Sequence, residues 1–172
     1  MSEYSSRLME LTGLSKSYCD LCEGAPEYSK EEFVDHMLDV LPRLYWNFFD
    51  ITPGVSLGES DYLGEYVDED MYESIRRGIS VVMGASDTFL ETFEEDMKYS
   101  DTPITSSISE CLADLYQPLF NFVSVVHDSE GSQLEEAFIA CKESFETYWS
   151  QTLCNVLRAL NNIKYHNEEE EF

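Results

Sequence analysis

Residues 99–127, YSDTPITSSISECLADLYQPLFNFVSVVH, carry the most regular apolar pattern in the chain. Apolar side chains recur there in steps of four and three residues, at Ile108, Leu112, Leu115, Leu119, Phe122 and Val126. Such steps place side chains on one face of an α-helix, and the opposite face is polar here. A helix with one apolar face must pack it against other elements. The stretch therefore predicts a helical bundle built around this helix.

The start of this helix has two candidates in the sequence. Thr102 followed by Pro103 would put proline at the first helical position, where its missing N–H costs nothing. Ser107 with Glu110 offers a capping box instead. The sequence does not choose between them. Further along, Pro118 predicts a bend, because proline leaves a carbonyl of the preceding turn unbonded.

The next helix is predicted to be the longest of the chain and to pair with the quoted one. A short turn at 128–131 separates them, and Ser132 with Glu135 forms a capping box that opens a helix reaching about Lys164. Its apolar row has an extra four-residue step between Phe145 and Trp149, which relaxes a left-handed supercoil. We expect the two helices to form an antiparallel hairpin.

Two helices are predicted nearer the N-terminus. The first covers about residues 3–23. The second begins at a capping box formed by Ser29 and Glu32, in which each side chain bonds the other residue's backbone N–H. Pro42 lies inside this second helix, so we expect a kink or a break there.

The middle of the chain alternates loops and helices. A long acidic loop is predicted at 50–67, and such loops often carry function. A third helix is expected over 69–83, started by Asp68 and ended by Gly84, and a short helix over 86–97. The acidic tail at 166–172 is expected to be mobile. The predicted fold is all-α: a single domain over 1–172, with five or six helices in a bundle and the C-terminal hairpin at its centre.

Composition narrows the classes of function. Ten Lys and Arg against 35 Asp and Glu give a formal net charge of -25. Binding to nucleic acid or to an anionic membrane surface needs clustered cations, so we expect neither partner. An acidic surface favours a partner protein with a basic surface. A mimic of nucleic acid is a less favoured interpretation of the same charge.

Three further features indicate a cytoplasmic protein. The chain has no run near the roughly 18 consecutive apolar residues of a membrane span. Its first residues lack the cationic start and apolar run of a signal peptide. The five cysteines are an odd number without the spacing of a disulfide framework, which suits a reducing compartment.

A polar site is the alternative to a pure interaction module. Arg158 lies between apolar positions of the longest helix, so its guanidinium needs a carboxylate or carbonyl groups nearby. Chain distance from the turn at 128–131 puts Asp101 level with Arg158, and the bend at Pro118 makes Asp114 the other candidate partner. Arg76 and Arg77 are a rare adjacent pair of cations, expected to pair with neighbouring carboxylates. The candidate site residues are Tyr99, Asp101, Thr102, Asp114, Arg76, Trp149 and Arg158.

Two runs of sequence resemble a known family. They are YSDTPIT with SISE and LADLYQ in the quoted stretch, and ESFETYWSQTLCNVLRAL from Glu143 to Leu160. The chain resembles the domain-of-unknown-function family 5063, small acidic proteins of gut anaerobic bacteria, from about Lys30 to Leu160. The resemblance implies an all-helical cytoplasmic domain and supplies no activity, cofactor or catalytic residue.

The leading hypothesis is therefore a non-enzymatic protein–protein interaction module. A ligand-binding or enzymatic domain with a polar site at the Tyr99–Thr102 corner and the C-terminal helix is the second hypothesis, and the mimic of nucleic acid is the third. An even spread of charge favours the first, a cleft with converging polar groups the second, and rows of carboxylates at phosphate spacing the third. The oligomeric state is not predicted.

We predict that the protein needs no cofactor and no transition metal. Cys19 and Cys22 have the C-x-x-C spacing of zinc sites, but the other cysteines are isolated, so a second pair of ligands is missing. His36 lacks the Glu three residues earlier that di-iron bundles use. Elemental analysis of the dialysed protein should find less than one zinc or iron atom per chain, and a stoichiometric metal would contradict the prediction.

Overall fold

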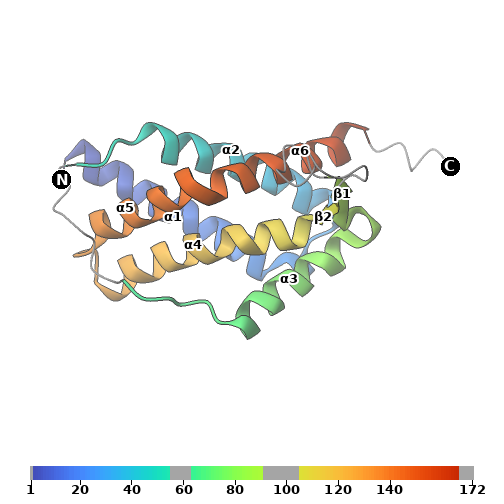
Figure 1. Cartoon of the computed structure of the whole chain (residues 1–172), viewed down its shortest axis with the longest axis horizontal. Helices are drawn as coiled ribbons and strands as arrows, with labels where there is room; N and C mark the ends of the chain where they lie inside the picture. The colour runs from blue at the N-terminus through green and yellow to red at the C-terminus, as the bar shows by residue number, and fades with distance from the viewer. Residues whose placement is uncertain (1, 55–62, 91–104, 167–172) are drawn as a thin grey trace, which may run out of the picture.

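The computed structural model describes residues 2–54, 63–90 and 105–166, which form a helical bundle (Figure 1). Its helices are α1 (Glu3–Glu23), α2 (Lys30–Asp50), α3 (Glu69–Met83), α4 (Ile108–Asp128), α5 (Leu134–Ser144) and α6 (Ser150–His166). The all-α prediction is confirmed, apart from one ladder of two short strands, β1 (Thr88–Leu90) and β2 (Thr105–Ser107). Among the described residues, none of the helices combines the length and the apolarity that crossing a membrane requires.

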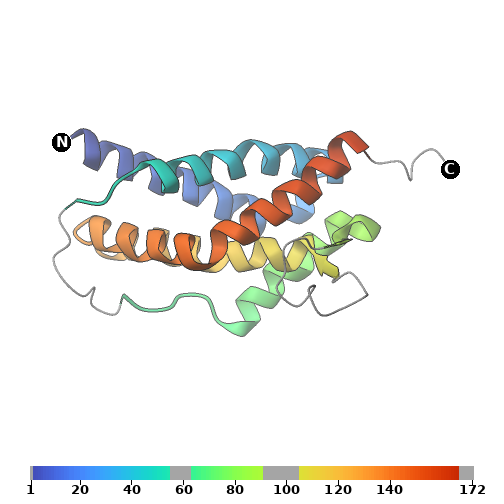
Figure 2. The same cartoon turned by 45° about the horizontal axis from the view of Figure 1, so that its top comes forward.

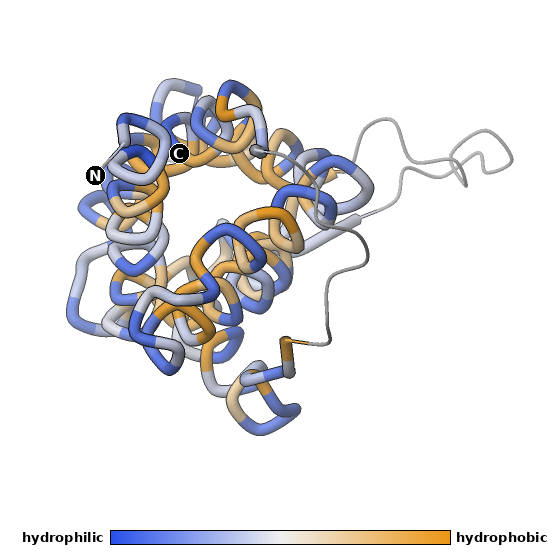
Figure 3. Tube along the Cα trace, turned by 90° about the vertical axis from the view of Figure 1, so that its left-hand side faces the viewer, coloured by the Kyte–Doolittle hydropathy of each residue, from blue (hydrophilic) through white to orange (hydrophobic). Residues whose placement is uncertain are grey.

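Helix α4 lies in the middle of the bundle, as its apolar periodicity predicts. It contacts α1, α3, α5 and α6, and Figure 1 shows it with α3 on one side and the α5–α6 rod on the other. The apolar faces of the helices turn inward around it (Figure 3). Tyr18 of α1 donates a hydrogen bond from its hydroxyl to the Leu112 carbonyl at 2.7 Å, so the hydroxyl of this buried tyrosine has a hydrogen-bond partner.

The predicted start signals of α2 and α3 are confirmed, and the start of α1 has a cap that was not predicted. Ser29 Oγ accepts from Glu32 N, and Glu32 Oε1 accepts from Ser29 N, which is the predicted capping box. Asp68 caps α3 by accepting from Met71 N at 2.8 Å. Ser2 caps α1. These signals act within four residues, so the sequence alone is enough to locate them.

Both internal prolines lie in unbroken helices. Pro42 is inside α2 and Pro118 is inside α4, and the helical backbone continues on either side of each ring. The predicted break at Pro42 is therefore wrong. Burial of the residues on both sides of each proline outweighs the single lost hydrogen bond, since packing supplies most of a helix's stability.

The prediction of a helix over 86–97 is wrong at residues 88–90, whereas residues 86 and 87 end a short 3₁₀ helix, Gly84–Asp87. Residues 88–90 form β1, which pairs antiparallel with β2, with Phe89 opposite Ser106. The remainder of that range lies outside the described residues. A strand wins at this position because the neighbouring strand, 17 residues further along the chain, supplies backbone partners that a local pattern cannot reveal.

Helix α4 begins at the second of the two predicted starts. Ser107 Oγ accepts from Glu110 N at 3.1 Å, and residues 105–107 are extended. Asp87 adds a cap from outside the helix: its carboxylate accepts from Ser109 N at 2.8 Å and from Ser109 Oγ at 2.7 Å. Asp87 and Ser109 are both buried, so the central helix is held at its start by a nearly enclosed charge-assisted contact.

The capping box predicted at Ser132 does not form. Helix α5 begins at Leu134 without a side-chain cap, and Ser129 Oγ instead accepts from Gln133 N at 3.1 Å. Glu130 and Gly131 have φ values of 51° and 86°, so the reversal after α4 needs two left-handed residues. This turn places the start of α5 at Leu134, one residue later than a cap at Ser132 would give.

The last two helices form one rod with a π turn, Phe145–Trp149, between them. Figure 2 shows the rod changing direction where α5 meets α6. Cys141, Phe145, Trp149 and Leu153 follow one another in steps of four, and an α-helix would turn that row by about 120° away from the core. The π turn takes up the extra residue, so all four side chains stay buried.

Phe48 of α2 ties this rod to the rest of the core. Its ring is fully buried and lies 5.0 Å from Trp149 and 5.8 Å from Phe145, between ring centroids. Phe138 and Phe122 contact it from α5 and α4 at 5.9 and 6.1 Å. One side chain therefore packs against three other parts of the bundle.

Asp87→Ala should lower the free energy of unfolding by about 2 kcal/mol, because it removes two buried hydrogen bonds to a charged group. Asp39→Ala is the matched control: Asp39 bonds only the exposed Arg43, a contact worth about 0.5 kcal/mol or less. Urea unfolding of the three proteins measures the difference. Equal losses for the two variants would show that Asp87 does not hold the start of α4.

Candidate functional site

Four of the seven residues predicted to form a polar site lie in the described part of the chain, and these four do not converge. Arg76, Asp114, Trp149 and Arg158 lie on four different elements and contact different residues. Tyr99, Asp101 and Thr102 lie outside the described residues, so the Tyr99–Thr102 corner stays a prediction.

Arg76 is held on the surface of its own helix. Its guanidinium forms a two-point contact with Glu73, three residues earlier on α3, and Arg77 lies 3.9 Å from the same carboxylate. The hydrogen bonds from Arg76 lower the pKa of the Glu73 carboxyl. The expected pairing with a neighbouring carboxylate is therefore present, and it occupies the cation.

Arg158 joins α6 to the strand ladder. It is exposed, donates a hydrogen bond to the Leu90 carbonyl and lies over the Phe89 ring, 5.8 Å from the centroid. Its partner is thus a carbonyl, one of the two kinds of group expected. The structure does not bring Arg158 and Asp114 together, because the π turn and the ladder set a register that distance from the turn at 128–131 does not give.

Trp149 belongs to the core. Its side chain is fully buried between Phe48 and Phe145, and its Nε1 has no hydrogen-bond partner among the described residues. The structure therefore supports packing, and not ligand contact, as the role of this residue.

Asp114 lies where two tyrosine hydroxyls meet. Tyr72 of α3 donates to its carboxylate at 2.7 Å, and the Tyr148 hydroxyl of the π turn interacts with the same carboxylate. Burial raises the pKa of the Asp114 carboxyl, and burial together with the bond to Asp114 raises the pKa of Tyr72. Tyr148 reaches Asp114 because the π turn directs Trp149 inward and leaves its neighbour at the surface.

Around Asp114 the surface forms an acidic recess of about 610 Å³. The recess is also lined by Asp68, Glu69, Asp70 and Glu73 at the start of α3. Within the described residues no set of three His, Cys, Asp or Glu is placed to hold a metal ion. Asp68, Glu69 and Asp70 are exposed, and Asp68 caps α3, while Glu73 is paired with Arg76.

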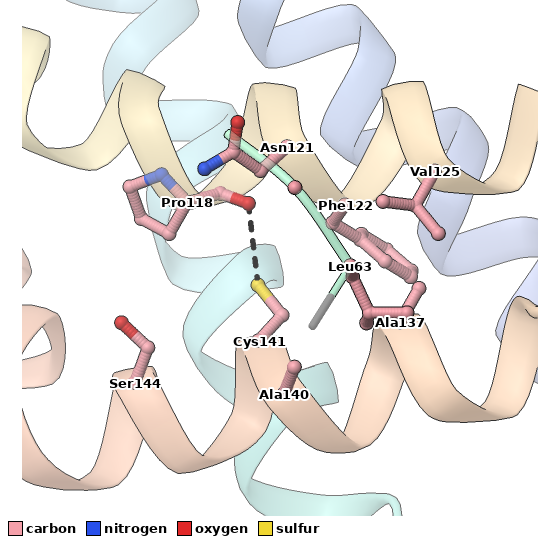
Figure 4. Close-up of a pocket in the computed structure, with 10 residues that line it drawn as sticks. Leu63, Pro118, Asn121, Phe122, Val125, Ala137, Ala140, Cys141 and Ser144 are labelled. Atoms are coloured by element: carbon pink, nitrogen blue, oxygen red, sulfur yellow. Dashed lines mark hydrogen bonds between the residues drawn. The ribbon is translucent and has the colours of Figure 1, made fainter. Parts of the chain in front are cut away.

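A second hollow, the α4–α5 groove, was not predicted. It has a volume of about 480 Å³ and lies between α4 and α5 beside Leu63 and Gly64 (Figure 4). On α5 its wall is made of small side chains, Ala137, Ala140, Cys141 and Ser144. The Cys141 thiol donates to the Pro118 carbonyl at 3.7 Å, and burial raises its pKa well above the ordinary value. The small residues at these four positions of α5 are the sequence feature from which the groove could have been predicted.

A third feature is the α2 aromatic patch, formed by Tyr45, Trp46 and Phe49. Their side chains are 37%, 56% and 60% exposed. The Phe49 ring lies 6.3 Å from Tyr45 and 6.0 Å from Trp46, between centroids, so the three rings form one surface. The Tyr45 ring also contacts Phe145 by an edge but stays partly exposed.

The end of α2 that carries the patch is fixed by other contacts. Lys142 of α5 donates from Nζ to the Ile51 carbonyl at 2.7 Å and to the Phe49 carbonyl at 3.3 Å. A cation at the C-terminus of a helix bonds carbonyls that have no partner within the helix. Arg7 and Asp50 form an ion pair at 3.0 Å beside it. The exposed rings are therefore presented by a firmly held helix end.

Comparison with known proteins gives a family and a fold. A family model described as Domain of unknown function (DUF5063) matches residues 2–166. The crystal structure of protein BF1032 from Bacteroides fragilis is similar over 93% of this chain and 93% of that chain, with a TM-score of 0.78 and 26% sequence identity. No curated protein matches.

Asp114→Asn should raise the free energy of unfolding at neutral pH, by up to about 1 kcal/mol because partial exposure screens the charge. Burial raises the pKa of the Asp114 carboxyl in the folded protein above its value in the unfolded chain. The protonated carboxyl therefore stabilises the fold at a pH below the pKa of the unfolded chain, and this stabilisation is lost as the pH rises through the pKa of the folded protein. The gain of the variant should therefore shrink as pH falls toward about 4.

Urea unfolding at a series of pH values tests this prediction. Asp70→Asn is the control, since it removes a charge from an exposed position in the same recess. A gain for Asp114→Asn that is independent of pH, or one shared equally by Asp70→Asn, would rule out the desolvated carboxyl as its cause.

Proposed function

The chain belongs to the family described as Domain of unknown function (DUF5063), and from its surface we propose that it is a non-enzymatic module that binds a partner protein with a basic surface. The observation that carries this proposal is the α2 aromatic patch. Exposed aromatic rings that contact one another are uncommon on a protein surface without a partner, and Tyr and Trp are enriched at the centres of interfaces.

Charge supports a basic partner. Every Lys and Arg in the described part of the chain already has a partner, in ion pairs or on carbonyl and hydroxyl oxygens. The formal net charge is -25, and no Lys or Arg in the described part of the chain is left without a partner to attract an anionic ligand. A phosphate backbone or an anionic membrane surface would be repelled, whereas clustered Lys and Arg on a protein would be attracted.

The patch and the charge have separate roles in the proposed complex. Trp46 and Phe49 supply the apolar contact that sets affinity, because their rings lose water on binding. The surrounding acids attract the partner and select it, an effect that weakens as salt screens charges beyond about 8 Å at physiological ionic strength. The partner is thus expected to present an apolar contact inside a rim of Lys and Arg.

A cytoplasmic location is part of the same proposal. No disulfide joins any of the five cysteines, all of which lie in the described helices, and Cys19, Cys22, Cys111 and Cys141 are buried. Cysteines that form no disulfide are typical of proteins from a reducing compartment.

The test is affinity purification of the tagged full chain from its own host, with mass spectrometry of what co-elutes. A basic protein should be retained by the wild type and reduced at least about tenfold by the double variant Trp46→Ser and Phe49→Ser. Tyr165→Ser is the matched control, because Tyr165 is 67% exposed on α6, away from the patch. Circular dichroism checks that each variant keeps its helices.

The salt dependence supplies the second readout. Binding of the identified partner, measured by calorimetry, should weaken as sodium chloride is raised from about 0.05 to about 0.5 M. A partner bound equally by the double variant and the wild type would show that the patch is not the interface. Binding that is indifferent to salt would show that charge does not select the partner.

A further inference from the structure

The α4–α5 groove has the size of a small-molecule site. Its volume of about 480 Å³ falls inside the range of roughly 300–1,000 Å³ that ligand pockets occupy. It exists because the side chains on α5 are too small to fill the space opposite Phe122 of α4. Two packed helices normally leave no such volume, since helix interfaces interdigitate to the density of a crystal.

The groove is bordered by a segment that α4 holds in place. Tyr66 donates from its backbone N–H to Asn121 Oδ1 at 2.8 Å, which fixes the irregular segment that includes Leu63 and Gly64. Leu63 then lies at the groove, as Figure 4 shows. Because the side-chain oxygen of Asn121 accepts this hydrogen bond, its amide nitrogen remains available to donate to a ligand. No described residue accepts a hydrogen bond from that nitrogen.

Polar and apolar groups lie at different ends of the groove. Figure 4 shows Pro118, Asn121 and Ser144 toward one end, and Leu63, Val125 and Ala137 toward the other. The described lining contains no charged side chain. A ligand that matches this arrangement has an apolar body and an uncharged head that exchanges hydrogen bonds with the Asn121 amide and the Ser144 hydroxyl.

A charged head fits poorly. An anion would lose its water without gaining a cation, and Asp114 lies on the same side of α4 two turns before Asn121, about 10 Å away by the helix rise. A cation would find no carboxylate in the described lining. We propose that the α4–α5 groove binds an uncharged, elongated apolar molecule that carries a hydroxyl or carboxamide at one end.

The experiment compares four probes with the same ten-carbon chain: 1-decanol, decanamide, decanoate and decylammonium. The full chain is labelled at its methyl groups and titrated, and the signals of Val125, Ala137 and Ala140 are followed by NMR. Decanol and decanamide should give saturable shifts confined to the groove. Decanoate and decylammonium should bind at least about tenfold more weakly, since each buries an unpaired charge.

Two variants test the location. Ala140→Leu fills the groove and should abolish the saturable shifts, whereas Ala85→Leu adds the same atoms at an exposed position and should leave them unchanged. Ser144→Ala removes one hydrogen-bonding group and should weaken decanol binding about three- to tenfold without altering the fold. The Ser144→Ala variant therefore still tests the location of the ligand if Ala140→Leu perturbs helix packing.

The outcomes separate this proposal from that of the aromatic patch. The double variant Trp46→Ser and Phe49→Ser should bind decanol like the wild type, because those rings are absent from the groove lining. Shifts spread over the whole surface, equal affinity for decanoate, selective binding of decylammonium, or unchanged binding by both Ala140→Leu and Ser144→Ala would each overturn the proposed ligand class or its location.

Discussion

Burial of α4 is the constraint on which the rest of this structure depends. The helix has an apolar face along its whole length and contacts four other helices, so its backbone cannot move without disturbing each of them. Its start is held by the buried Asp87–Ser109 contact, and one turn further on the Leu112 carbonyl accepts from the Tyr18 hydroxyl. These polar contacts fix the position of a helix that apolar packing alone would leave free to slide.

The π turn adapts the last helices to that fixed element. The row from Cys141 to Leu153 advances in four-residue steps, and one extra residue in the turn keeps Phe145 and Trp149 against Phe48. The same turn leaves Tyr148 at the surface, where its hydroxyl interacts with Asp114. Before the turn, small residues on α5 leave the α4–α5 groove open. Core packing and the α4–α5 groove thus both depend on how the α5–α6 rod is oriented against α4.

The candidate surfaces differ in how far local sequence could predict them. The acidic surface follows from composition, and the pairing of Arg76 with a nearby carboxylate follows from helical spacing. The partners of Arg158 and Asp114 could not be predicted, because both depend on elements distant in sequence: β1 for the first, α3 and the π turn for the second. The α2 aromatic patch was missed for a related reason. Tyr45, Trp46 and Phe49 are exposed because none of the described helices covers that side of α2, and this depends on how the helices pack.

The sequence by itself determined the all-α class, the extents of α1 and α3, the start of α2, and the two possible starts of α4. Those features depend on caps and periodicities that act within about one helical turn. Tertiary structure decided which start α4 uses, because the choice depends on Asp87 and on a strand ladder that pairs residues 88 and 107. It also decided that Ser129, and not Ser132, shapes the turn before α5. Such choices are made by contacts between distant segments, which exist only once the bundle has closed around its central helix.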